Sequence, residues 1–129
     1  MENLEISATT RSPEISFDIE RRHLTIKGES YPEDASAFYS KILKALDEVL
    51  EKIGDSPFYF DIKLIYFNSS SAKALMTMLE RLDEAAGKGA AVTIRWFYDV
   101  EDDFMRELGE EFREDLEHAD FRLEVLEVR

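Results

Sequence analysis

Few residues in this chain have the chemistry of a catalytic site. None of its 129 residues is a cysteine, which excludes disulfides, thiolate nucleophiles and cysteine-ligated metals. The two histidines are His23, in a stretch of strand-like alternation, and His118, in the polar stretch LEHAD. Neither has a second histidine at metal-ligand spacing. We therefore expect both histidines to have structural or solvated roles.

Two other patterns each have a chemical and a simpler structural interpretation. Ser70 and Lys73 match Ser-x-x-Lys, the acylating pair of serine β-lactamases and penicillin-binding proteins, but the other motifs of those enzymes are missing. The acidic run Asp99–Asp103 could hold a hard cation, yet it lacks the glycine-punctuated loop of a calcium site. It also precedes a helix, whose positive end favours acidic residues. The sequence predicts no enzyme, no cofactor and no metal site.

Four small polar residues interrupt the stretch LIYFNSSSAKALM. Asn68 or Ser69 can cap the following helix by accepting hydrogen bonds from N–H groups two or three residues on. A cap leaves at least one hydroxyl of Ser69, Ser70 and Ser71 unexplained. A phosphate on that hydroxyl would lie at the positive end of the helix and add about −1.5 to −2 charges to the surface. The stretch is thus a helix cap, or a phosphorylation switch that repels a docking partner.

Strand and helix signals alternate along the chain. The segment EISFDIERRHLTIKG predicts two strands joined by a charged turn. FYFDIKLIYF is almost continuously apolar, which is typical of a central strand covered on both faces. Apolar residues at helical spacing predict three helices. The predicted strands are 4–8, 14–18, 23–27, 58–67, 91–99 and 121–128, and the predicted helices are 35–53, 72–86 and 100–116.

This order predicts an α/β fold in one domain, residues 1–129. Strands that alternate with helices indicate right-handed crossovers and a mostly parallel central sheet. The early strands would extend one side of that sheet as an N-terminal hairpin.

The composition limits the classes of partner. Sixteen basic against 29 acidic residues give a formal charge of −13, which disfavours nucleic acids and anionic membrane surfaces. The start MENLEISATTRSPE lacks the charged and apolar regions of a signal peptide, and no apolar run approaches the roughly 18 residues of a membrane span. We expect a cytoplasmic protein.

The strand–Asn-Ser-Ser-Ser–helix arrangement resembles the phosphorylation site of STAS-domain anti-sigma factor antagonists. More specifically, the chain resembles the SiaC-type regulatory phosphoproteins. The stretches that carry this resemblance follow one another in order and are SPEISFD (12–18), LTIKGESYPEDASAFY (24–39), LIYFNSSSAKAL (64–75), TIRWFYDVEDDFMRELGEEFRED (93–115) and Phe121.

The resemblance implies a STAS-like fold without enzymatic activity. It implies that a dedicated Ser/Thr kinase modifies the residue directly after the asparagine, here Ser69, and that a PP2C-type phosphatase removes the phosphate. The neighbouring Ser70 and Ser71 are the alternative acceptors. The unmodified form would bind and activate a diguanylate cyclase, which links the switch to cyclic-di-GMP and biofilm control. The alternative is a partner switch of another pathway that binds an anti-sigma kinase.

The partner surface is expected around the switch junction, which comprises Asn68, Ser70, Ser71 and Lys73. The stretch WFYD ends a strand at the same predicted sheet edge as Asn68. Neighbouring side chains on a strand alternate faces, so its three aromatic residues cannot all point inward. The candidates for partner binding from WFYD are Trp96, Tyr98 and Asp99. Two more come from the stretch GESYPED, namely Tyr31 and Pro32.

Overall fold

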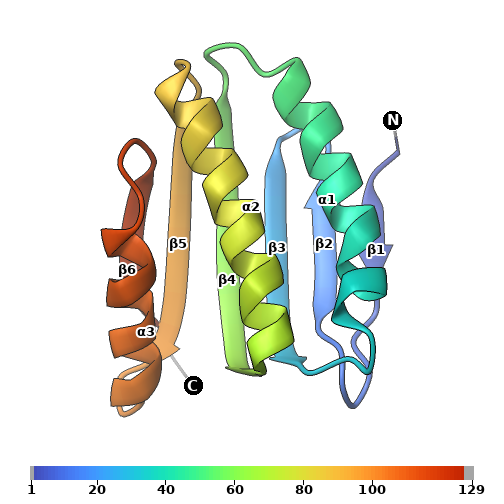
Figure 1. Cartoon of the computed structure of the whole chain (residues 1–129), viewed down its shortest axis with the longest axis vertical. Coiled ribbons are helices and arrows are strands. Elements are labelled where there is room, and N and C mark those ends of the chain that lie inside the picture. Colours follow the sequence, from blue (N-terminus) through green and yellow to red (C-terminus); the bar gives the residue numbers. More distant parts are fainter. Residues whose placement is uncertain (1, 127–129) are drawn as a thin grey trace.

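The computed structural model describes residues 2–126 (Figure 1). Six strands form one sheet, and three helices connect the last four of them. The elements are β1 (Leu4–Ile6), β2 (Glu14–Asp18), β3 (His23–Ser30), α1 (Ala35–Glu51), β4 (Pro57–Phe67), α2 (Ser69–Gly87), β5 (Ala91–Asp99), α3 (Asp103–Glu114) and β6 (Asp120–Leu126).

The strands lie in the sheet in the order of the sequence, from β1 to β6. β1, β2 and β3 are antiparallel neighbours, whereas β3, β4, β5 and β6 run parallel. The predicted α/β fold, with a mostly parallel sheet and an N-terminal antiparallel hairpin, is therefore confirmed. The predicted strand 121–128 is found as β6, and its residues 127 and 128 lie outside the described part of the chain.

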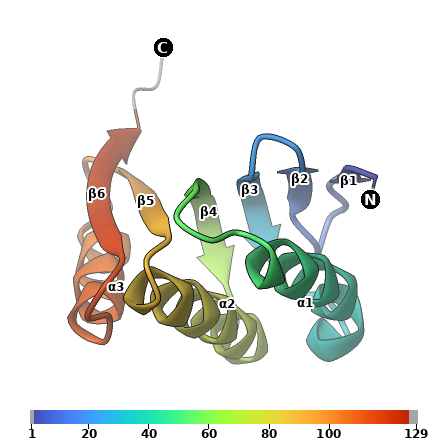
Figure 2. The same ribbon diagram turned by 90° about the horizontal axis from the view of Figure 1, so that it is seen from above.

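All three helices lie on one face of the sheet (Figure 2). Right-handed crossovers that always advance in the same direction place every helix on the same side. The prediction that β4 is covered on both faces is therefore wrong. Phe58, Phe60 and Ile62 of β4 point toward the helices and are buried, whereas Tyr59 on the open face is 39% exposed.

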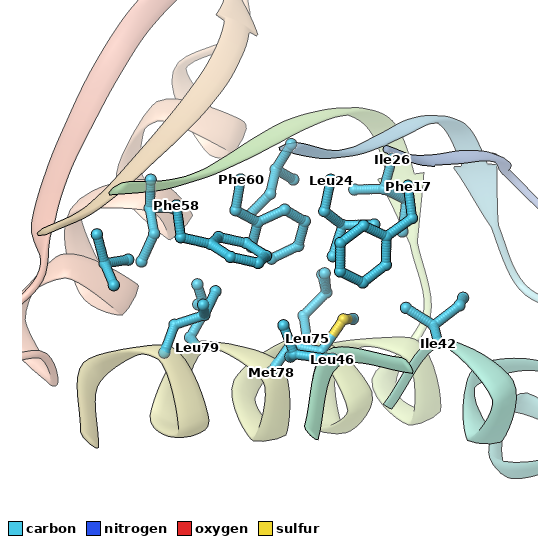
Figure 3. Close-up of a cluster of buried hydrophobic side chains, with 14 of the residues drawn as sticks. Phe17, Leu24, Ile26, Ile42, Leu46, Phe58, Phe60, Leu75, Met78 and Leu79 are labelled. Carbon is cyan, nitrogen blue, oxygen red and sulfur yellow. The ribbon is translucent and has the colours of Figure 1, made fainter. Parts of the chain in front are cut away.

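The core lies between the sheet and the helices α1 and α2. Figure 3 shows apolar side chains of the strands facing those of the two helices across this layer. The helix side chains recur at intervals of three and four residues, which gives each helix one apolar face. The labelled core residues are Phe17, Leu24, Ile26, Ile42, Leu46, Phe58, Phe60, Leu75, Met78 and Leu79.

A bulge near the end of β4 changes which side chains face the helices. Gly28 pairs with Leu64 and the next residue of β3, Glu29, pairs with Tyr66, so Ile65 is an extra residue in β4. The inserted residue reverses the alternation beyond it. Phe67 consequently packs against Trp96, while Tyr66 is exposed.

The helix α3 packs closely on β5 and β6 through a glycine. A Cβ atom at Gly109 would lie 2.6 Å from Cδ1 of Trp96 and 2.6 Å from Cδ2 of Leu123. The indole of Trp96 is fully buried there and donates a hydrogen bond from Nε1 to the carbonyl of Met105 at 3.0 Å.

No helix within residues 2–126 is long and apolar enough to cross a membrane.

Gly109→Ala should lower the free energy of unfolding, measured by urea denaturation. Overpacking against Trp96 costs about 1–3 kcal/mol, and the better helix propensity of alanine offsets about 1 kcal/mol of this. Glu107→Ala, at an exposed position of the same helix, is the control and should change stability by less than about 0.5 kcal/mol. A Gly109→Ala variant more stable than the original chain would contradict this close packing.

Candidate functional site

The carboxyl ends of four strands and the starts of three helices meet at one edge of the sheet, the lower edge in Figure 1. We call it the carboxyl edge. It exists because β3, β4, β5 and β6 are parallel, and each helix α1–α3 begins just after the strand before it. The four-residue polar stretch lies at this edge, between β4 and α2.

Asn68 caps α2. Its Oδ1 accepts a hydrogen bond from the backbone N–H of Ser71 at 2.9 Å, and its own N–H donates to the carbonyl of Ser30 at 3.0 Å. The predicted helix cap is thus confirmed, and the capping residue is Asn68 rather than Ser69. The side chain of Ser69 is not needed for the cap.

Ser71 has a structural role in a buried hydrogen-bonded chain. Ser30 Oγ donates to Ser71 Oγ at 2.7 Å and lies 2.6 Å from Tyr39 Oη. A serine hydroxyl has one hydrogen, so Tyr39 is the donor to Ser30. All three side chains are fully buried. Ser71 is therefore inaccessible to a kinase, and the prediction that it is an alternative phosphate acceptor is wrong.

The sequence carried a signal for this role. Ser71 precedes Leu75, Met78 and Leu82 at spacings of four, seven and eleven residues, and all of these side chains are buried.

Burial also raises the pKa of Tyr39 to about 12, although its hydrogen bonds to Ser30 and Ser71 act in the opposite direction. Tyr39 is consequently a neutral hydroxyl that connects α1 to the start of α2.

Ser69 and Ser70 are both exposed, but they face different surroundings. Ser70 lines a cleft of about 520 Å³ between α1 and α2, together with Lys73, Glu33 and Asp34. Ser69, about 100° around the helix axis from Ser70, does not line this cleft. Within the described residues Ser70 makes no hydrogen bond to Lys73.

The predicted partner-binding residues divide between surface and core. Trp96 is fully buried under α3, so the prediction that it belongs to the partner-binding surface is wrong. The alternation of buried Val92, Ile94 and Trp96 with polar Thr93 and Arg95 in the sequence indicates this inward position.

The remaining candidates lie at the carboxyl edge. Tyr98 is partly buried against the core and Asp99 is exposed, with Oδ1 accepting from the N–H of Glu101 at 2.8 Å. Tyr31 and Pro32 are half-buried, and the ring of Tyr31 packs edge-to-face on Tyr66 at 5.8 Å.

Sequence reasoning missed a group of exposed apolar side chains at the same edge. They are between 46% and 69% exposed and come from the ends of β4 and β6, the turn after β5 and the first turn of α3. We call them the apolar rim: Ile65, Tyr66, Val100, Phe104 and Val125. In the sequence, Val100 and Phe104 flank an acidic stretch, which is a detectable signal. Ile65 and Tyr66 are hidden in the apolar run of β4; Ile65 lies on the open face by ordinary alternation, and the bulge places Tyr66 there as well.

The acidic run after β5 caps the helix α3. Asp102 caps α3, with Oδ1 accepting from the N–H of Met105 at 3.1 Å. Across residues 2–126 no group of three His, Asp or Glu side chains is arranged to hold a metal ion.

The two histidines have ordinary surroundings. His23 Nε2 lies 2.9 Å from Asp61 Oδ2 on the open face of the sheet, where Arg95 also binds both oxygens of Asp61. His118 is exposed in the loop before β6, and its backbone N–H donates to Asp83 at 2.8 Å.

Comparisons with known proteins give consistent relatives. Residues 6–126 match the family model described as SiaC family regulatory phosphoprotein. An uncharacterized protein of Pseudomonas aeruginosa strain UCBPP-PA14 is 37% identical over 115 residues, which cover 89% of this chain and 90% of that protein.

Two solved structures are similar to the chain over nearly its whole length. The crystal structure of apo-SiaC from Pseudomonas aeruginosa has a TM-score of 0.89 at 35% identity, covering 96% of this chain and 99% of that one. In the crystal structure of the diguanylate cyclase SiaD from the same organism in complex with its activator SiaC, the matched chain has a TM-score of 0.90 at 35% identity. The match covers 95% of this chain and 99% of that chain.

Ser71→Ala should destabilise the protein, whereas Ser70→Ala should not. The first change removes the acceptor of the buried Ser30 hydroxyl, which costs about 1–3 kcal/mol of unfolding free energy. The second removes an exposed hydroxyl and should stay within about 0.5 kcal/mol. Urea denaturation of the two variants measures the difference. Equal stabilities would contradict a structural role for the chain of hydroxyls.

Proposed function

The chain belongs to the SiaC family of regulatory phosphoproteins, and from this we propose that it is a phosphorylation-controlled partner switch without enzymatic activity of its own. The modified residue is Ser69. The unmodified form binds and activates an output protein, a diguanylate cyclase, and the phosphorylated form does not. The protein then acts in the cytoplasm, in cyclic-di-GMP signalling and biofilm control.

The observation that carries this proposal is the position of Ser69. Its hydroxyl is exposed and is not used for the cap, because Asn68 supplies that hydrogen bond. Ser71 is excluded as an acceptor by its burial, and Ser70 faces the cleft between α1 and α2. Ser69 also directly follows the asparagine, as the acceptor does in the proteins that this chain resembles.

A phosphate on Ser69 would be compatible with the fold. The first N–H groups of a helix have no partner within the helix, and the helix dipole favours a negative charge at this end. The apolar core contacts of α2 begin at Ala74 and Leu75, and Ser69 is exposed, so a phosphate on Ser69 leaves these contacts unchanged. The modification would then act on the surface rather than on stability.

The output surface that we propose is the carboxyl edge around Ser69. The apolar rim gives this edge the exposed apolar side chains that protein interfaces bury at their centres. Its aromatic members Tyr66 and Phe104 are of the residue types that contribute most to binding. Tyr31, Tyr98 and Asp99 extend it toward the neighbouring strand ends.

A diguanylate cyclase is the output partner favoured by the relatives. A SiaC chain of the same fold has been crystallised in complex with the diguanylate cyclase SiaD as its activator. A dedicated Ser/Thr kinase and a PP2C-type phosphatase would set the phosphorylation state.

Phosphopeptide mapping of the protein purified from its own cells should find a single phosphate, on Ser69. Intact-mass analysis of the same samples should show the phosphorylated fraction varying with growth state. Ser69→Ala should abolish the modification and Ser70→Ala should retain it, because only Ser69 is both exposed and outside the α1–α2 cleft. Absence of phosphate in all conditions, including a strain that lacks PP2C-type phosphatases, would overturn the switch.

Ser69→Ala and Ser69→Asp should differ in their affinity for the output partner. The diguanylate cyclases of the same organism can be purified and titrated calorimetrically with each variant. The carboxylate should weaken binding at least about tenfold, or 1.4 kcal/mol, because a charge buried without a partner is unfavourable in an interface. Ser70→Asp is the matched control and should bind more tightly than Ser69→Asp. Equal binding by all variants would contradict a switch based on charge.

A further inference from the structure

The two edges of the sheet are built differently. Figure 1 shows β1 at one margin and β6 at the other. β1 is a strand of three residues, whereas β6 has seven. Its register with β5 runs from Asp120 to Leu126 without a bulge, and its sequence contains neither proline nor lysine. Short strands, bulges, prolines and charged side chains, especially lysine, are the usual means of blocking pairing at an edge. Of these, β6 has only the charged residues Asp120, Arg122 and Glu124.

The sequence of β6 is complementary to itself. When two copies of DFRLEVL pair antiparallel with Leu123 opposite Leu123, each Arg122 lies opposite a Glu124 of the other copy. Phe121 lies opposite Val125 in the same way. Opposite charges and apolar pairs at directly facing positions stabilise an antiparallel ladder by roughly 0.2–1 kcal/mol each.

The two kinds of pair lie on different faces. Phe121 and Val125 pair in register with Ile94 and Tyr98 of β5, whose side chains face the helices. Arg122 and Glu124 lie on the open face, where Arg122 Nη2 also binds Asp120 of its own strand at 2.7 Å. In the antiparallel pair, Arg122 would lie between this aspartate and the Glu124 of the other copy.

Other registers are less favourable. Centring the pair on Arg122 or on Glu124 places two like charges opposite each other, which destabilises a ladder. A shift by one residue places apolar side chains of one copy on the polar face of the other. Only the register centred on Leu123 pairs all seven residues of β6 with opposite charges and apolar pairs at its centre; Asp120 faces Leu126 at each end.

We propose that two copies of this chain associate through β6, in an antiparallel pair centred on Leu123, to form a continuous twelve-stranded sheet. The two-fold axis is perpendicular to the sheet, so the helices of both copies lie on the same face. The carboxyl edges of the two copies then point in opposite directions, and the dimer presents two separate surfaces around Ser69, each without Val125, which pairs within the ladder.

The overall charge does not prevent this association at physiological salt. Each copy carries a formal charge of −13, but charges separated by more than about 8 Å are largely screened there. Repulsion therefore acts mainly between groups near the contact, where Arg122 and Glu124 attract each other. Lower salt should weaken the dimer, because distant acidic groups then repel more strongly.

Sedimentation velocity on the full chain, mass 15.0 kDa, tests the proposal with charge reversals. The original chain should sediment as a dimer at physiological salt, and Arg122→Glu and Glu124→Arg should each sediment as monomers, because each reversal places like charges opposite each other. Lys44→Glu on α1, an exposed position away from β6, is the control and should leave the dimer intact.

Mixing the two single-reversal variants should restore a dimer. The glutamate introduced in one copy then faces the arginine introduced in the other, and the unchanged Glu124 of the first faces the unchanged Arg122 of the second. The double variant with both reversals should dimerise alone, since its two charged pairs are again opposite in sign.

Two results would overturn the proposal. One is an original chain that remains monomeric at every concentration tested. The other is a dimer that is unaffected by the single reversals, or one that neither the mixture nor the double variant restores. Far-ultraviolet circular dichroism of each variant separates loss of the dimer from loss of the fold. Binding of the output partner plays no part in this measurement, so its outcome is independent of the switch at Ser69.

Discussion

The architecture depends on one constraint, the right-handedness of each β–α–β crossover combined with a strand order that never reverses. This combination places α1, α2 and α3 on one face and leaves the other face of the sheet without a helix layer (Figure 2). It also collects all three helix starts at the carboxyl edge. The open face is stabilised instead by its own side chains, with Asp61 buried by Arg95 and His23. Without a reversal, the helical connections of neighbouring strands all leave on the same face of the sheet, so the crevice that doubly wound sheets form between connections to opposite faces is not present.

The hydroxyls at the start of α2 have different environments because α2 has a fixed rotation about its own axis. Leu75 and Leu79 pack against the sheet, which turns Ser71 inward to Ser30 and Tyr39. Ser69 is turned outward by the same rotation. The buried hydroxyl chain satisfies polar groups that would otherwise be costly in the core, and it ties β3, α1 and α2 together directly beneath the exposed serine. The position of Ser69 is thus fixed by contacts that do not involve its own side chain.

Most of the fold could be predicted from the sequence because its signals are local. Alternation in β2, β3 and β6, helical spacing in α1 and α2, and acidic capping at α3 each depend on neighbouring residues, and the structure confirms them. The missing helix layer over β4 could not be predicted, since it depends on the direction of every crossover. The exposure of Tyr66 depends on the bulge in β4 between the partners of Gly28 and Glu29, which is a property of two strands. The burial of Trp96 and Ser71 was predictable from periodicity. Trp96 continues the alternation of buried residues in β5, and Ser71 lies at helical spacing from the buried residues of α2.

The magnitude of the charge indicates how a phosphate at Ser69 would have to act. Adding about −2 to a protein that already carries −13 changes its distant field by a small fraction, and that field decays over about 8 Å at physiological salt. A partner that only passed near the carboxyl edge would scarcely distinguish the two forms. Discrimination therefore requires that the partner bury Ser69 itself, where removing a phosphate from water is costly. The apolar rim supplies the exposed apolar contacts that would hold a partner close enough for this.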